Sequence, residues 1–217
     1  MSHSVLLVPV PLLEPFVRAR TAHYDLDYVS ADPAFVHAHV TALGPFLPPP
    51  DLDALDVDVI TEICRSTAPF TFELSRIETF PNGIIHLVPE PEDRFRDLTA
   101  RLWQAFPDCP PYAGEFPDVR PHLTLDACSE AVSEESTRRL LADVLPATCR
   151  AEQLDLAWYE RGACRVARTW ALGEPPGAEP RAGAQRPAAV TPSTWRTTSA
   201  TSGYASGSVW LPMPRMA

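Results

Sequence analysis

Two tripeptides that each combine a histidine with a threonine are the residues of this chain best suited to chemistry. They are His39-Val40-Thr41 and His122-Leu123-Thr124. Residues i and i+2 of a β-strand point to the same face, about 6.6 Å apart along the chain. A strand would therefore present the imidazole and the hydroxyl of each tripeptide to one side and bury the apolar middle residue. Two such pairs facing one cleft would supply a base, an acid and two hydroxyl donors for a phosphoryl oxygen, without a metal ion.

Short strands alternating with short helices are predicted along residues 1–172. Alternating apolar residues predict strands over 35–43, ended by Gly44-Pro45, and over 122–127, so both tripeptides fall in strands. A helix is predicted over 92–106, because four apolar residues share one face at helical spacing. The remaining predicted elements are strands over 4–10, 70–79, 84–88, 149–159 and 163–172 and helices over 15–21, 55–64 and 134–144, the last capped by Ser133.

Turn sequences between neighbouring strands indicate the fold class. Pro81-Asn82-Gly83 and Arg161-Gly162 each separate two predicted strands and are typical of β-hairpins. Hairpins in both halves favour antiparallel sheets with helices outside, so we predict an α+β protein and not a doubly wound parallel sheet. After Leu172 the chain is rich in Pro, Gly, Ala, Ser and Thr. We therefore predict one domain over 1–172 and a disordered tail over 173–217.

The composition excludes several classes of function. All 18 basic residues are Arg, which excludes lysine-dependent chemistry such as Schiff-base catalysis and ligation through a nucleotidyl-lysine. The net charge of −10 disfavours binding to long duplex nucleic acid through many phosphates. No apolar run of about 18 residues is present to span a membrane, and the first residues do not resemble a secretory signal. We expect a cytoplasmic protein that, if it handles nucleic acid, handles an end or a small piece.

The segments HVTALGPF at 39–46 and RPHLTL at 120–125 resemble the paired motifs of the two-histidine (2H) phosphoesterases. This superfamily includes cyclic phosphodiesterases and the 2′-5′ RNA ligase family. The resemblance covers residues 4–172 in element order and departs from the pattern at Ala42, where relatives more often carry Leu. It implies a bilobal fold of two pseudo-symmetric antiparallel sheets, with outer helices, around a central cleft. It also implies that His39 and His122 transfer protons and that Thr41 and Thr124 bind phosphate.

The resemblance implies a metal-independent phosphoesterase that acts on 2′,3′-cyclic phosphodiesters. One histidine would activate water and the other would protonate the departing ribose oxygen. Run in reverse, the same groups would form a 2′-5′ linkage without ATP. The expected partner is an RNA terminus or a small cyclic nucleotide, and we expect a monomer without a cofactor. The direction of the reaction and the assignment of acid and base stay open.

Four further residues are candidates for substrate contacts, and each has a structural alternative. Tyr112 could stack on a base or pack in a turn, Arg120 could bind phosphate or lie on the surface, and His86 could face the site or be a hydrogen-bonded sheet residue. His37 shares a face with His39 and could lie at the cleft edge or join His39 in binding a metal ion. The rival hypotheses are therefore a metal-dependent hydrolase using His37 and His39, and a non-catalytic nucleotide-binding protein of the same fold.

Overall fold

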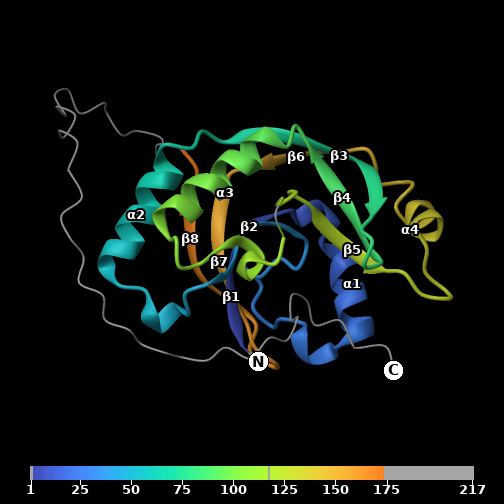
Figure 1. The fold of residues 1–217 in the computed structure, drawn as a ribbon. Coiled ribbons are helices and arrows are strands. Elements are labelled where there is room, and N and C mark those ends of the chain that lie inside the picture. The colour runs from blue at the N-terminus through green and yellow to red at the C-terminus, as the bar shows by residue number, and fades with distance from the viewer. Residues whose placement is uncertain (1, 117, 174–217) are drawn as a thin grey trace.

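Two four-stranded antiparallel sheets form the framework of the protein (Figure 1). The structure is a computed structural model and describes residues 2–116 and 118–173. Sheet A consists, in spatial order, of β2 (His39–Phe46), β1 (His3–Pro9), β7 (Gln153–Tyr159) and β8 (Arg165–Ala171). Sheet B consists of β5 (Leu123–Ala127), β4 (Ile84–Glu90), β3 (Phe70–Thr79) and β6 (Ala147–Ala151). The predicted α+β class is confirmed. Apart from Gly173, the predicted tail lies outside the described residues.

Each sheet ends in a strand associated with one of the His-x-Thr tripeptides. β2 lies at one edge of sheet A and begins at His39, whereas β5 lies at one edge of sheet B and begins one residue after His122. The two edge strands contact each other. The sheets therefore meet along the strands that carry the tripeptides, and segments far apart in the sequence become neighbours.

The apolar run of β1 explains its central place in sheet A. Leu6 and Val8 pack into the larger hydrophobic cluster, whereas Val5 and Leu7 pack into a smaller one with Tyr159. A strand buried on both faces needs apolar residues at successive positions and not at alternate ones. β1 pairs with β2 on one side and with β7 on the other, so it fixes the position of the strand that carries His39.

In the described part of the chain, four α-helices pack outside the sheets. They are α1 (Glu14–Tyr24), α2 (Ala54–Arg65), α3 (Asp93–Ala105) and α4 (Glu134–Leu140). α1 contacts β5, whereas α2 and α3 lie together on the other side of the molecule (Figure 1). Short 3-10 helices cover Pro11–Leu13, Leu26–Tyr28, Pro49–Asp51 and Pro111–Gly114. Within residues 2–116 and 118–173, none of the helices has the length and the apolar character that a membrane crossing needs.

Three predicted boundaries are wrong for identifiable physical reasons. The predicted strand over 35–43 starts at His39 and continues through Gly44-Pro45 to Phe46, because an edge strand tolerates a proline that lacks an N–H. The predicted strand over 149–159 is two strands, β6 and β7, which belong to different sheets and separate at Glu152. The helix over 134–144 ends at Leu140, a few residues before Leu145-Pro146, where proline disfavours helical geometry in its neighbour.

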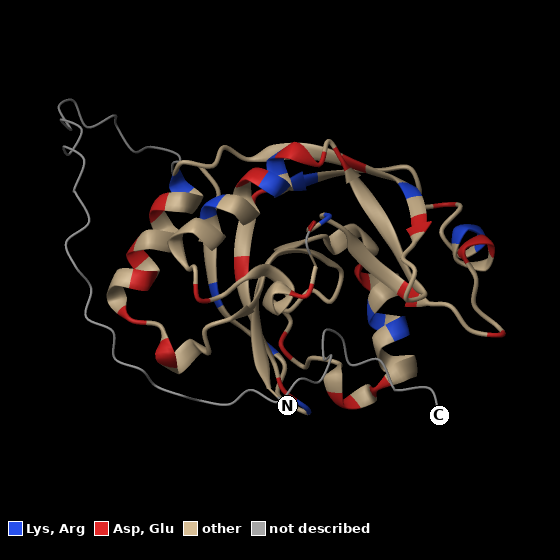
Figure 2. Cartoon of the chain, in the orientation of Figure 1, with Lys and Arg blue, Asp and Glu red and all other residues tan. Residues whose placement is uncertain are grey.

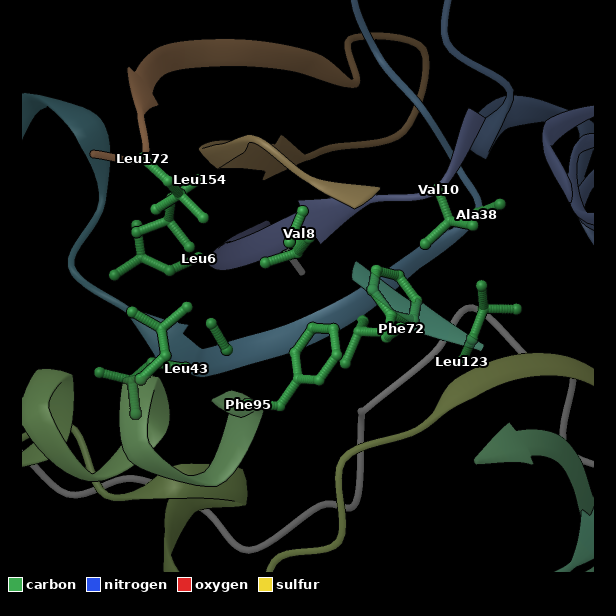
Figure 3. Close-up of a cluster of buried hydrophobic side chains, with 14 of the residues drawn as sticks. Leu6, Val8, Val10, Ala38, Leu43, Phe72, Phe95, Leu123, Leu154 and Leu172 are labelled. Carbon is green, nitrogen blue, oxygen red and sulfur yellow. The ribbon is translucent and has the colours of Figure 1, made fainter. Parts of the chain in front are cut away.

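One continuous core connects both sheets with α3 (Figure 3). The predicted helix face is confirmed, since Phe95, Leu98 and Leu102 are buried. The ring of Phe95 packs edge-on against Phe70 and Phe72 of β3, with 5.0 Å between ring centroids in each pair. Leu6 and Leu154 of sheet A and Leu123 of sheet B belong to the same cluster. The core therefore holds the two sheets, and with them the two tripeptides, in a fixed relation.

Replacement of Phe95 by Ala tests this role of the core. We expect Phe95→Ala to lower the free energy of unfolding by about 3–5 kcal/mol, because the side chain is 1% exposed and its loss leaves a cavity. The measurement is chemical denaturation followed by circular dichroism. Trp103→Ala on the same helix is the control, since that ring is 46% exposed, and we expect about 1 kcal/mol or less. Equal losses for both variants would contradict the proposed role of Phe95.

Candidate active site

A cleft of about 650 Å³ lies where the two edge strands meet, and it is lined by residues from both sheets and from α1. The four polar side chains of the tripeptides, His39, Thr41, His122 and Thr124, all line this cleft. Val40 and Leu123, the middle residues, are fully buried in the core. The i, i+2 spacing of a strand thus brings two imidazoles and two hydroxyls to one space.

A backbone carbonyl two residues earlier orients each imidazole of the tripeptides. The Nδ1 atom of His39 lies 2.7 Å from the carbonyl oxygen of His37, and that of His122 lies 2.8 Å from the carbonyl oxygen of Arg120. A carbonyl oxygen only accepts hydrogen bonds, so each neutral ring carries its proton on Nδ1. The lone pair is then on Nε2, to which no described residue hydrogen-bonds. Each ring is therefore prepared to accept a proton at Nε2.

Burial sets the charge of these two rings. It lowers the pKa of His39 to about 4, and the pKa of His122 also to about 4. Desolvation is the largest cause in both cases, and the hydrogen bond to the backbone carbonyl opposes it. Both imidazoles are consequently neutral at pH 7. An anion bound between them would favour the imidazolium form and raise both pKa values.

Glu14 in the first turn of α1 holds the segment that carries His39. One carboxylate oxygen lies 2.6 Å from His37 Nδ1, and the other accepts a hydrogen bond from the Ala38 N–H at 3.0 Å. The Nε2 atom of His37 accepts a hydrogen bond from the Ser30 N–H at 3.1 Å. Both ring nitrogens of His37 are therefore engaged, which disfavours the predicted alternative of a metal ligand. Among residues 2–116 and 118–173, no group of three or more metal-ligating side chains comes together.

His86 lies beside His122 and is almost completely buried. It is 1% exposed, stacks on Phe80 with 3.7 Å between ring centroids, and meets the ring of His122 edge-on at 5.5 Å. It is not among the described residues that line the cleft. Burial lowers the pKa of His86, and any positive charge on it would lower the pKa of His122 further. His86 therefore lies in the sheet behind the site, and its buried Nε2 has no hydrogen-bond partner among the described residues.

Arg120 lines the cleft and also supports it through its backbone. Its guanidinium lies 2.9 Å from Glu78 and 3.5 Å from Glu92, while its carbonyl oxygen accepts the hydrogen bond from His122. The two carboxylates neutralise the guanidinium charge near the cleft wall. This network anchors the residue whose carbonyl fixes the orientation of His122.

Tyr112 crosses the space between the two tripeptides. Its ring is nearly parallel to that of His122, with 6.0 Å between centroids, and its hydroxyl is hydrogen-bonded with Thr41. Burial raises the pKa of Tyr112 to about 12, so the phenol stays protonated. The backbone is left-handed at Tyr112 (φ 51°) and Ala113 (φ 53°), a conformation that few non-glycine residues adopt. Such strain clusters at functional sites, because the surrounding structure must stabilise it.

Several residues of the cleft carried no sequence signal. Five residues that line the cleft were not predicted as site residues: Arg20, Thr21 and Tyr24 of α1, Tyr159 of β7, and Phe116. Helical periodicity shows which residues share a face, but not which strand that face will meet. The three α1 residues reach the cleft because α1 packs against β5.

The family model of the 2′-5′ RNA ligase superfamily matches residues 8–163, a range that includes both tripeptides. The chain belongs to this superfamily. Its 2H phosphoesterase pattern was predicted from the tripeptides, and that prediction is confirmed. No curated protein of significantly similar sequence was found.

Solved structures that match this chain include three from Thermus thermophilus and E. coli. TT0787 of Thermus thermophilus has a TM-score of 0.53 and 18% identity, covering 79% of this chain and 98% of that one. E. coli LigT complexed with 3′-AMP has a TM-score of 0.48 and 18% identity, over 80% and 99% of the two chains. E. coli LigT complexed with NADP+ has a TM-score of 0.46 and 18% identity, over 80% and 98%. The likeness to TT0787 shows a shared fold.

An NMR titration of the imidazoles tests the electrostatics of the cleft. We expect the ring resonances of His39 and His122 to stay constant from pH 8 to about 5.5 and to titrate near pH 4. Spectra of His39→Gln and His122→Gln variants assign the signals. Midpoints near the ordinary value of 6.5 would contradict burial as the controlling cause.

Proposed function

We propose that this protein is a metal-independent phosphoesterase that opens 2′,3′-cyclic phosphodiesters of RNA ends or small nucleotides. The observation that carries the proposal is the paired arrangement in one cleft. Two imidazoles with Nδ1 tied to the backbone, and a threonine hydroxyl two residues after each, line the same space. The membership of the 2′-5′ RNA ligase superfamily supports this chemistry.

The proposed reaction needs two proton transfers and one displacement at phosphorus. One Nε2 removes a proton from water as its oxygen attacks the phosphorus, and the second histidine, protonated at Nε2, donates a proton to the departing ribose oxygen. The bond from phosphorus to that oxygen breaks, and a phosphomonoester remains. The hydroxyls of Thr41 and Thr124 donate hydrogen bonds to the non-bridging oxygens, where negative charge increases.

The low pKa values of His39 and His122 are compatible with this scheme. A general acid must hold a proton at the working pH, whereas both rings are neutral before substrate binds. The phosphate brings a negative charge beside two buried rings, and this charge favours protonation of one imidazole. Binding of the substrate therefore prepares the acid.

We infer the roles of the two rings from their charged neighbours. His39 has one neighbour that lowers its pKa, His37, and one that raises it, the carboxylate of Glu14. The charged neighbours of His122, which are His86, His39 and Arg120, all lower its pKa. On this difference we propose His39 as the acid and His122 as the base. His37 and its hydrogen-bonded carboxylate lie on the side of the acid.

The same groups would join two RNA ends if another nucleophile replaced water. The 5′-hydroxyl of a second RNA end would attack the phosphorus, the bond from phosphorus to the 3′ oxygen would break, and a 2′-5′ phosphodiester would form with no ATP and no lysine. Product analysis with short RNA substrates distinguishes hydrolysis from joining.

Substitution of the four polar residues tests the catalytic assignment. With EDTA present, we expect His39→Ala or His122→Ala to lower kcat by about a hundredfold to ten-thousandfold on a panel of 2′,3′-cyclic nucleotides and short RNAs. Thr41→Ala and Thr124→Ala remove a neutral donor and should cost about 1–3 kcal/mol of transition-state stabilisation. The control is His23→Ala, an exposed histidine of α1 outside the cleft.

Melting temperatures separate catalysis from stability in these variants. Activity that falls only in proportion to lost stability would show that the four residues are structural. Activity that EDTA abolishes and zinc restores would favour a metal-dependent hydrolase instead.

The assignment of acid and base predicts the effect of Glu14→Gln on the pH profile of kcat. Loss of the carboxylate charge lowers the pKa of His39, so the alkaline limb, which reports the acid in the complex, should move to lower pH by a fraction of a unit. The acidic limb, which reports His122, should stay in place. Glu135→Gln, at an exposed position of α4, is the control. A shift of the acidic limb alone would reverse the assignment.

A further inference from the structure

The cleft contains a cation that the proposed hydrolysis leaves unused. Arg20 projects from α1 and lines the cleft together with Thr21 and Tyr24 of the same helix. Its side chain is 21% exposed. Figure 2 shows basic residues on α1 where this helix passes β5.

Asp126 at the end of β5 holds this guanidinium in one orientation. The Nε atom of Arg20 lies 2.6 Å from one carboxylate oxygen of Asp126, and Nη2 lies 3.0 Å from the other. The hydroxyl of Tyr24 bonds to the same carboxylate, and the guanidinium carbon lies 5.2 Å from the centre of the Tyr24 ring. Asp126 itself is 2% exposed. The cation is therefore fixed before any ligand binds.

A β-bulge in β5 places the side chain of Asp126 against Arg20. Thr124 pairs with His86, whereas Asp126 pairs with the preceding residue of β4, Ile85, so Leu125 is an additional residue in the strand. The alternation of side chains between the two faces of the strand, which holds through Thr124, ends at Leu125. Leu125 lines the cleft beside Thr124, and Asp126 meets Arg20 of α1.

The free part of the guanidinium suits an oxygen anion. Nη2 donates a hydrogen bond to the carboxylate of Asp126 and Nε lies close to it, while Nη1 donates to no residue among 2–116 and 118–173. A guanidinium stays charged at all physiological pH values and binds phosphate oxygens through several N–H groups. Elsewhere the cleft is lined by the aromatic rings of Tyr112 and Phe116, which meet edge-on, and by the charged residues Glu115 and Arg120. Aromatic rings favour a base, and the α1 side favours a second phosphate.

We propose that Arg20 binds a second phosphate group of the substrate, attached to the 5′ oxygen of the nucleotide whose cyclic phosphate lies between His39 and His122. The favoured substrate class is then a 2′,3′-cyclic nucleotide with a 5′ phosphate, as found in the last nucleotide of an RNA chain. This inference rests on the proposed function and deepens it.

The test compares adenosine 2′,3′-cyclic phosphate with the same compound bearing a 5′ phosphate. We expect the wild-type protein to show a kcat/KM about ten- to a hundredfold higher for the 5′-phosphorylated compound, the range for a hydrogen bond to a charged group. Arg20→Gln should bring the ratio of the two values close to one. Arg18→Gln, an exposed arginine on the same helix outside the cleft, should keep the wild-type ratio.

A second variant removes the risk that loss of Arg20 leaves a buried carboxylate unpaired. Arg20→Gln combined with Asp126→Asn removes both charges and retains groups that can hydrogen-bond to each other and to Tyr24. This double variant should also show a ratio near one, with a melting temperature close to that of the wild type. A wild-type ratio near one, or an equal decrease for both compounds in the variants, overturns the role of Arg20 while the proposed function stands. Hydrolysis of neither compound, nor of any substrate in the panel, overturns the proposed function itself.

Discussion

The hydrogen bond from Nδ1 of each imidazole to a carbonyl oxygen two residues earlier is the interaction on which the cleft depends. It determines the tautomer, so the atom that can exchange a proton is Nε2 in both His39 and His122. It also makes each ring part of the local backbone, and the backbone segments are held in turn by Glu14 on one side and by Glu78 through Arg120 on the other. The orientation of the reacting atoms is therefore a property of the two sheets and not of flexible side chains.

The two halves of the cleft are similar in geometry and different in charge. The carboxylate of Glu14 and the imidazole of His37 lie behind the His39 side, whereas the imidazole of His86 and the guanidinium of Arg120 lie behind the His122 side. Two chemically identical residues acquire different proton affinities only through such neighbours. The two antiparallel sheets place one imidazole on each side of the proposed phosphate position. The residues packed behind the sheets give the two imidazoles different proton affinities, as an acid and a base require.

The sequence predicted the parts of the site that depend on spacing within one strand. His39, Thr41, His122 and Thr124 share a cleft because residues i and i+2 share a strand face. The parts that depend on which elements meet were not predictable, as Arg20 on α1 and the division of 149–159 between two sheets show. The left-handed backbone at Tyr112 and Ala113 could not be predicted from the sequence either, because neither tyrosine nor alanine favours this conformation.

The placement of β2 and β5 also bears on how the protein avoids self-association. A sheet edge exposes unpaired N–H and C=O groups that can pair with another molecule and start aggregation. β2 contacts β5 and the turn at Pro111–Gly114, so two of the four edges face the interior of the molecule. The third edge, β8, carries Arg165 and Arg168, and the fourth, β6, has five residues and includes Arg150. Charge and short length are the means by which natural sheets keep their edges from pairing, so the arrangement that creates the cleft also reduces the surface open to aggregation.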